Sequence, residues 1–211
     1  MKRYEQISAF ILCGGASSRM GQPKGLLDFG GEPLLIRIAR LVEPLVSAIM
    51  AVGTHSQYAD LGLPLIEDAE FAGSQERHGK AGPLAGIATA LTASRSEWNL
   101  IVGCDLPYLT REWLNWLLGY VMGIDAQILI PKTAGGLEPL AAVYRKECAD
   151  PLIEALRRGT RKVTDAIAPL RLQVIREMQW QHIDCDRRVL RNMNTPQDYE
   201  EARMWLQRPR S

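Results

Sequence analysis

The chain has 211 residues, of which 46% are hydrophobic and 23% charged, the composition of an ordinary globular protein. Lys and Arg number 25 against 24 Asp and Glu, so the formal net charge is +1 and no global field attracts nucleic acid or an anionic membrane. No segment approaches the ~20 uninterrupted apolar residues that a membrane-spanning helix needs.

The periodicity of apolar residues predicts strands that alternate with helices. Strands are expected at residues 7–13, 48–52, 63–66, 99–103, 126–130 and 140–144, with an edge strand at 172–175. Helices are expected at residues 34–46, 83–93, 111–121, 151–158, 162–168 and 196–206, with Thr110 and Thr195 as N-caps. This alternation is typical of an α/β fold with a mostly parallel, doubly wound sheet flanked by helices.

The four cysteines, Cys13, Cys104, Cys148 and Cys185, are scattered and form no C-x-x-C pair. The three histidines also lack metal-ligand spacing. We therefore expect reduced core cysteines in a cytoplasmic protein, with neither a zinc site nor a redox motif.

A glycine-rich loop follows the first predicted strand, with Gly14 and Gly15 at its start and Arg19 and Lys24 further along. Because glycine has no Cβ, the backbone N–H groups can approach an anion closely. Arg and Lys add positive charge suited to phosphate. The loop lacks the G-x-G-x-x-G spacing of dinucleotide-binding proteins. We interpret it as a triphosphate cradle; the alternative is a solvated turn.

Carboxylates follow two other predicted strands. Asp105 closely follows the strand at 99–103, and Pro107 blocks an immediate helix after it. A hard oxygen ligand at this place would suit Mg²⁺. Asp68 follows the third strand and can accept hydrogen bonds from a base or a ribose, or can be part of a solvated turn. Gly82 opens the next predicted helix, whose N-terminal N–H groups favour anions. Ligands of such sheets bind beyond the carboxyl ends of the strands.

These stretches resemble the molybdenum cofactor guanylyltransferases, the molybdopterin-guanine dinucleotide biosynthesis protein A family. The resemblance covers about residues 9–202 and is carried by residues 12–15, 19–21, 24–27, 66–68, 82–86, 104–108 and 192–196. The segments Glu138-Pro139-Leu140 and Tyr144-Arg145 narrow it to the molybdopterin branch. The resemblance implies a single Rossmann-like nucleotidyltransferase domain over residues 1–211, with a nucleotide-binding half at about 7–110 and an acceptor-binding half at about 111–206.

It further implies transfer of GMP from GTP to the phosphate of molybdopterin, with Mg²⁺ as cofactor. The GTP-binding residues would be Leu12, Cys13, Gly14, Gly15, Lys24, Asp68, Gly82 and Asp105. Asp105 would hold Mg²⁺, and Lys24, Arg19 and Asp105 would be catalytic because they neutralise phosphate charge. Asn192 and Asn194 would lie toward molybdopterin.

A local basic cluster, Arg157, Arg158, Arg161 and Lys162, can bind the acceptor, and Arg161 is our candidate; the alternative is a solvated helix end. The Gly14-Gly15 doublet favours GTP over CTP as the substrate, because the resemblance implies Ala-Gly at these two positions in the related cytidylyltransferases. Cys13 stands where the family usually has Ala. Gly53-Thr54 departs from an Asn expected after the second strand, so selectivity for the base stays open.

Two rival functions remain. One is a molybdopterin cytidylyltransferase that uses CTP, and the other is a non-catalytic carrier that binds nucleotide or molybdopterin. The expected partners are GTP and molybdopterin as substrates, together with transient contact to molybdoenzyme chaperones or cofactor-insertion proteins. We expect neither nucleic acid nor a membrane as partner.

Overall fold

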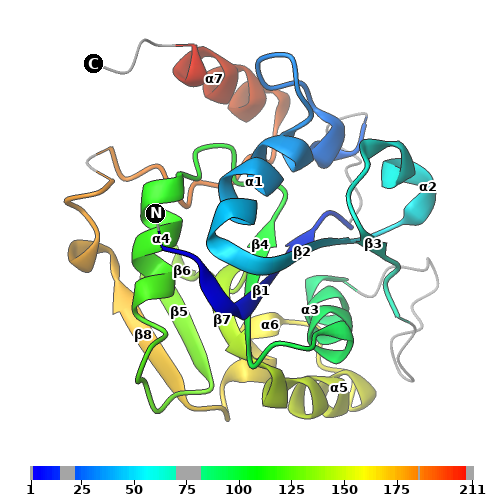
Figure 1. Cartoon of the computed structure of the whole chain (residues 1–211), viewed down its shortest axis with the longest axis vertical. Coiled ribbons are helices and arrows are strands. Elements are labelled where there is room, and N and C mark those ends of the chain that lie inside the picture. The colour runs from blue at the N-terminus through cyan, green and yellow to red at the C-terminus, as the bar shows by residue number, and fades with distance from the viewer. Residues whose placement is uncertain (1, 15–21, 70–81, 185, 208–211) are drawn as a thin grey trace.

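One mixed β-sheet runs through the centre of the molecule, and helices cover both of its faces (Figure 1). The computed structural model describes residues 2–14, 22–69, 82–184 and 186–207. The strands are β1 (Tyr4–Leu12), β2 (Val46–Val52), β3 (Leu65–Ile66), β4 (Trp98–Gly103), β5 (Ile128–Thr133), β6 (Gly136–Leu137), β7 (Ala141–Arg145) and β8 (Leu172–Arg176). The helices are α1 (Leu34–Val42), α2 (His55–Tyr58), α3 (Gly82–Ala93), α4 (Arg111–Gly119), α5 (Ala149–Arg157), α6 (Val163–Ile167) and α7 (Pro196–Leu206).

The strand order is β3-β2-β1-β4-β7-β5-β6, and β8 pairs with β5. β1 is parallel to β2 and β4, β2 to β3, and β5 to β8. β7 runs antiparallel to both β4 and β5, and β6 runs antiparallel to β5. The carboxyl ends of β1, β2, β3, β4, β5 and β8 therefore meet at one edge of the sheet. The predicted mostly parallel α/β sheet is confirmed.

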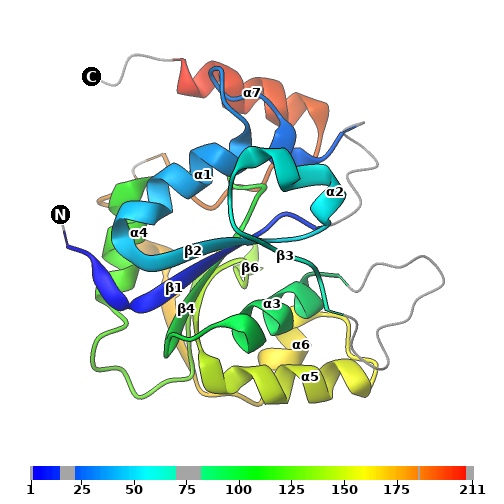
Figure 2. The ribbon, with the colours of Figure 1, turned by 45° about the vertical axis from the view of Figure 1, so that its right-hand side comes forward.

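Alternation along β1 divides the core between the two faces of the sheet. Ile7, Ala9 and Ile11 pack with buried residues of α1 and α4. Phe10 and Leu12 pack with buried residues of α3, α5 and α6. Figure 2 shows α1, α4 and α7 on one side of the strands and α3, α5 and α6 on the other. This arrangement explains why β1 is buried from Ile7 to Leu12 and apolar there except at Ser8.

Several element boundaries differ from the sequence predictions. The helix expected at 34–46 ends at Val42, because Pro44 has no backbone N–H, and a 3-10 turn (Glu43–Leu45) leads directly into β2. The strand expected at 126–130 lies at Ile128–Thr133 and continues past Pro131, whose carbonyl still accepts the N–H of Glu138. The short strand β6 and the helix α2 were not predicted. The edge position of β8 is confirmed, since it pairs with β5 alone among the described strands.

Both predicted N-caps are confirmed. The Thr110 side chain accepts a hydrogen bond from the N–H of Trp113 at the start of α4. Thr195 does the same for Asp198 at the start of α7. None of the helices in the described ranges is long and apolar enough to cross a membrane.

Candidate active site

The segments that follow β1, β2, β3 and β4 lie side by side at the carboxyl edge of the sheet. The pairing continues one residue beyond the strands: the Cys13 N–H donates to the carbonyl of Val52 (2.9 Å) and the Cys104 N–H donates to that of Leu12 (3.0 Å). The Gly53 N–H donates to the carbonyl of Ile66 (3.0 Å). The edge thus gathers Gly14, Gly53, Asp68 and Asp105, which are far apart in the chain.

Asp68 lies against glycines from two other segments. A Cβ at Gly14 would stand 2.8 Å from Asp68 Oδ2, and a Cβ at Gly86 of α3 would stand 3.5 Å from Oδ1. Burial raises the pKa of Asp68 above its ordinary value. Asp68 is nevertheless exposed at this edge, so its carboxylate can accept hydrogen bonds from the N–H or O–H groups of a ligand.

The backbone at Cys13 is fixed inside the protein. Its N–H bonds to Val52, and its carbonyl accepts the hydroxyl of Tyr58 at 2.9 Å, a contact that sequence reasoning missed. A Cβ at Gly53 would stand 2.8 Å from Cys13 Sγ and 3.1 Å from the nitrogen of Gly14, so the glycine at 53 lets β2 and the glycine loop pack closely. The loop beyond Gly14 lies outside the described residues, so its presentation of backbone amides to a ligand stays a prediction.

The predicted core cysteines are confirmed for the described positions. Cys13, Cys104 and Cys148 are free thiols and are buried. Burial, followed by the charge of Asp68, raises the pKa of Cys13 to about 12, so this thiol stays protonated at neutral pH. Cys185 lies outside the described residues.

Lys24, Asp105 and Asn194 converge from three segments. Lys24 Nζ lies 2.8 Å from Asn194 Oδ1 and 3.4 Å from Asp105 Oδ2. The Lys24 and Asp105 side chains are only 19% and 23% exposed. A Cβ at Gly103 would stand 2.7 Å from Asp105 Oδ1, so the carboxylate rests directly over that glycine. The cation expected to bind phosphate and the carboxylate expected to bind metal therefore share one site.

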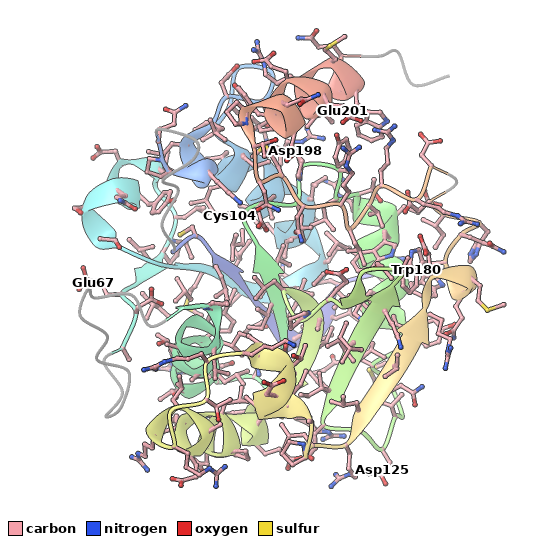
Figure 3. The ribbon with its side chains drawn as sticks, turned by 180° about the vertical axis from the view of Figure 1, so that it is seen from behind. Glu67, Cys104, Asp125, Trp180, Asp198 and Glu201 are labelled. Carbon is pink, nitrogen blue, oxygen red and sulfur yellow. The ribbon has the colours of Figure 1, made fainter. Side chains whose placement is uncertain are left out.

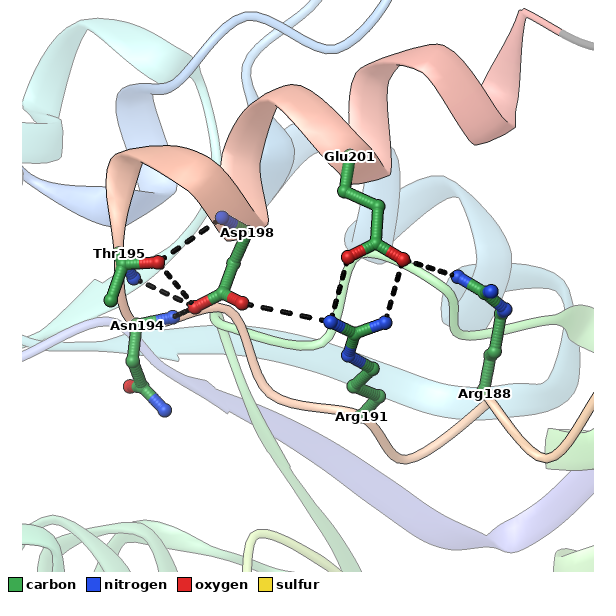
Figure 4. Close-up of polar contacts among 6 residues, drawn as sticks. All are labelled: Arg188, Arg191, Asn194, Thr195, Asp198 and Glu201. Atoms are coloured by element: carbon green, nitrogen blue, oxygen red, sulfur yellow. Dashed lines mark hydrogen bonds and ion pairs between the residues drawn. The ribbon is translucent and has the colours of Figure 1, made fainter.

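The start of α7 holds Asn194 in place (Figure 4). Asp198 Oδ2 accepts the N–H groups of Asn194 (3.0 Å) and Thr195 (2.9 Å), and Thr195 Oγ1 accepts the N–H of Asp198 (3.1 Å). The hydrogen bond from the Asn194 backbone, followed by those from Thr195, lowers the pKa of Asp198. Asp198 thus closes a capping box, in addition to the predicted favourable placement of its charge at the positive end of the helix.

Ion pairs tie the preceding loop to the same helix. Glu201 accepts two hydrogen bonds of 2.7 Å from Arg191 and one of 2.7 Å from Arg188. In Figure 3, Asp198 and Glu201 lie on α7 above Cys104, which directly precedes Asp105 at the end of β4. The Met193 N–H also donates to the backbone carbonyl of Asp105 at 2.9 Å. The segment before α7 is therefore fastened to both the helix and the end of β4.

A cavity of about 320 Å³ opens at the β5–β8 side of this edge. It is lined by Thr133, Ala134, Gly135, Glu138, Glu177, Trp180, Asp184, Arg187, Val189, Leu190, Arg191 and Asn192. The two asparagines expected near molybdopterin are thus divided between two surroundings: Asn192 lines the cavity, whereas Asn194 bonds Lys24.

The other expected site residues have the following places. Gly15 and Arg19 lie outside the described residues, so their roles stay predictions. Gly82 is the first residue of α3 and has a φ of +67°, a conformation that favours glycine. Arg161 is exposed just before α6, and its role in acceptor binding also stays a prediction.

Two other members of the basic cluster belong to the surface of α5. Arg157 and Arg158 each lie within 4 Å of Glu154 on that helix, at 3.9 and 3.8 Å, and all three side chains are at least half exposed. Such exposed pairs are typical of a solvated helix end. Arg157 and Arg158 therefore have the surroundings of a solvated helix end, and whether the cluster binds the acceptor stays a prediction.

Comparison with known proteins gives a consistent result. A family model described as "MobA-like NTP transferase domain" matches residues 9–174. A protein of Pelotomaculum thermopropionicum named "Probable molybdenum cofactor guanylyltransferase" is 31% identical over 207 residues, which cover 98% of this chain and 96% of the relative. A relative of the same name from Carboxydothermus hydrogenoformans is 34% identical, covering 93% of this chain and 95% of its own length.

Solved structures show the same likeness. Molybdopterin-guanine dinucleotide biosynthesis protein A from Archaeoglobus fulgidus is similar with a TM-score of 0.77 and 25% identity, covering 94% of this chain and 97% of that chain. A CMP:2-keto-3-deoxy-manno-octonic acid synthetase is similar with a TM-score of 0.65 and 11% identity, covering 95% and 98%. The second likeness concerns the fold alone.

Proposed function

Because this chain belongs to the MobA-like NTP transferase family, we propose that it is a guanylyltransferase that transfers GMP from GTP to the phosphate of molybdopterin. One observation carries the proposal beyond the family: Lys24, Asp105 and Asn194 meet at the carboxyl edge of the sheet. A cation beside a carboxylate that can hold a metal ion is suited to the transfer of a nucleotidyl group from a triphosphate to a phosphate, because both substrates are anions.

The nucleotide would occupy the side of the site built by β1, β2 and β3. Backbone amides from Gly14 onward, with Gly15 and Arg19, would contact the phosphates, and Lys24 would neutralise their charge. Leu12 and Cys13 would approach the guanine through their backbone. Asp68, which is exposed and lies beside Gly14, would accept hydrogen bonds from the base or the ribose.

Oxygen ligands at the site fit a Mg²⁺ ion. The Asp105 carboxylate and the Asn194 amide oxygen both lie around Lys24, and such hard oxygens are the ligands that Mg²⁺ prefers. In the described part of the chain, no group of three or more His, Cys, Asp or Glu is placed to hold a metal ion. Mg²⁺ is usually held by one or two carboxylates together with substrate phosphates. When bound, the ion would supply neutralisation of phosphate charge.

The chemistry requires no protein nucleophile. The phosphate oxygen of molybdopterin would attack the α-phosphorus of GTP in line, forming a new P–O bond as the bond to the β-phosphate oxygen breaks and pyrophosphate leaves. The attacking group is already an anion, so no strong base is needed. Lys24 would balance charge on the transferring and leaving phosphates, and Asn194 would hold the Lys24 ammonium toward them. The nearby cavity, lined by Asn192, would take the acceptor, with Arg161 as a further candidate contact.

A pyrophosphate-release assay with Mg²⁺ tests the proposal. The chain should release pyrophosphate with GTP only when molybdopterin is present, and CTP should support much less release. Equal or greater release with CTP would instead identify a cytidylyltransferase. Binding of GTP without pyrophosphate release under either condition would indicate a carrier.

A further inference from the structure

Glu138 is a carboxylate at the active-site edge whose role the transfer chemistry leaves open. It lies between β6 and β7, and its backbone is bonded on both sides: its N–H donates to the carbonyl of Pro131 (2.9 Å), and its carbonyl accepts the N–H of Ala141 (3.1 Å). The sheet therefore fixes the backbone from which this side chain projects.

One hydroxyl orients the Glu138 carboxylate. Thr133 Oγ1 donates to Glu138 Oε1 at 2.7 Å. Thr133 Oγ1 also accepts the N–H of Gly135 at 3.1 Å, so its own hydrogen is turned toward the glutamate. Within the described residues, Thr133 is the only donor to this carboxylate, and no Lys or Arg pairs with it there. An ionised carboxylate accepts about four hydrogen bonds, so most of its capacity remains for a ligand.

The surroundings of Glu138 favour a ligand that donates hydrogen bonds to its carboxylate. The side chain lines the 320 Å³ cavity together with Asn192. Burial raises the pKa of Glu138, the Thr133 hydrogen bond lowers it, and the negative charge of Asp105 raises it again. Glu138 is thus partly desolvated and close enough to Asp105 to sense its charge. A ligand group that donates N–H bonds would be stabilised here, whereas a phosphate would be repelled.

The acceptor in the proposed reaction has such a group. A pterin ring presents an amino group beside a ring N–H, two parallel donors that match the two oxygens of a carboxylate. We propose that Glu138 receives this N–H edge of the pterin and thereby selects and orients molybdopterin, with its phosphate directed toward Lys24 and Asp105. The inference rests on the proposed function and adds a specificity-determining residue to it.

Steady-state kinetics of the Glu138→Gln variant test this role. Glutamine keeps an oxygen for the Thr133 hydroxyl but replaces the other oxygen with an NH₂ donor, which opposes the donors of the pterin. Loss of a charge-assisted pair should raise the KM for molybdopterin roughly 10- to 100-fold. The kcat and the KM for GTP should change less than about threefold, since charge-stabilising residues lie elsewhere.

The matched control is Glu147→Gln. Glu147 is exposed and follows β7 at the opposite edge of the sheet, so this variant should keep all three constants. The unfolding midpoint reports whether each variant folds. If Glu138→Gln does not fold, Glu138→Asp shortens the side chain by one methylene, retains its charge, and should raise the same KM.

The outcomes are distinct. An unchanged KM for molybdopterin, an equal rise in the KM for GTP, an increased requirement for Mg²⁺, or a loss of kcat at saturating acceptor would overturn the assignment of Glu138. In each of these cases the unmodified chain still transfers GMP. Absence of transfer by the unmodified chain would instead reject the proposed function, and this inference with it.

Discussion

Asn194→Ala is the substitution that most directly tests how the site is assembled. The Asn194 side chain accepts a hydrogen bond of 2.8 Å from Lys24 Nζ, and its own backbone is held by Asp198. Alanine removes the acceptor but leaves the backbone bonds at the start of α7 in place. The change should therefore loosen the Lys24 ammonium without unfolding the helix.

The magnitude follows from the geometry. A hydrogen bond to a charged group contributes about 1.5–3 kcal/mol, and each ~1.4 kcal/mol corresponds to about tenfold. Lys24 keeps the Asp105 carboxylate at 3.4 Å, and its side chain is 19% exposed, so water replaces part of the lost bond. We expect the lower part of that range, a fall of roughly 10- to 30-fold in kcat/KM.

The assay is pyrophosphate release with GTP, Mg²⁺ and molybdopterin for Asn194→Ala, Lys24→Ala and the double variant. Lys24→Ala should cost on the order of 10²-fold or more. Because Asn194 acts through Lys24, the double variant should be little worse than Lys24→Ala alone. The reasoning is refuted if Asn194→Ala retains full kcat/KM, or if the two losses multiply as independent effects.

Four further outcomes are expected. Asp105→Ala should lower kcat at least ~10²-fold; undiminished pyrophosphate release would reject its role. Gly14→Ala should raise the KM for GTP, because the new Cβ would stand 2.8 Å from Asp68 Oδ2, and an unaltered KM would argue against a nucleotide on this side. Asp68→Asn should increase the stability of the ligand-free protein at neutral pH, because burial raises the pKa of Asp68 and so penalises its charged form. The same substitution should weaken GTP binding. Denaturant unfolding measures the stability and titration measures the binding; a less stable variant would contradict the first effect. Asp198 has a lowered pKa, so its stabilising effect is present above the ordinary value of about 3.9 and is lost as pH falls through the lowered value. The difference in the free energy of unfolding between the unmodified chain and Asp198→Asn should therefore become smaller from pH 7 to pH 3. A difference that stays constant would contradict this.

Local signals in the sequence were sufficient for most elements and for the chemistry of the site residues. Apolar runs identified β1 and β4, and Thr195 with Pro196 marked the start of α7. Glycines after a buried strand and a carboxylate after β4 indicated phosphate and metal ligands. Such features depend on neighbours within a few residues, which is why they can be read without coordinates. The boundary near Pro44 was missed because a 3-10 turn accommodates this proline, and the one near Pro131 because strand pairing does.

Proximity depends on the tertiary structure. Lys24 lies 81 positions from Asp105 and 170 from Asn194, and only the sheet order and the docking of α7 bring the three together. The hydrogen bond from the Tyr58 hydroxyl to the Cys13 carbonyl likewise joins residues 45 positions apart. The amino-acid sequence by itself determined which chemical groups this protein carries and which strands and helices carry them. The folded chain decided which groups share a site, because contacts between distant segments arise only when the sheet aligns its strand ends.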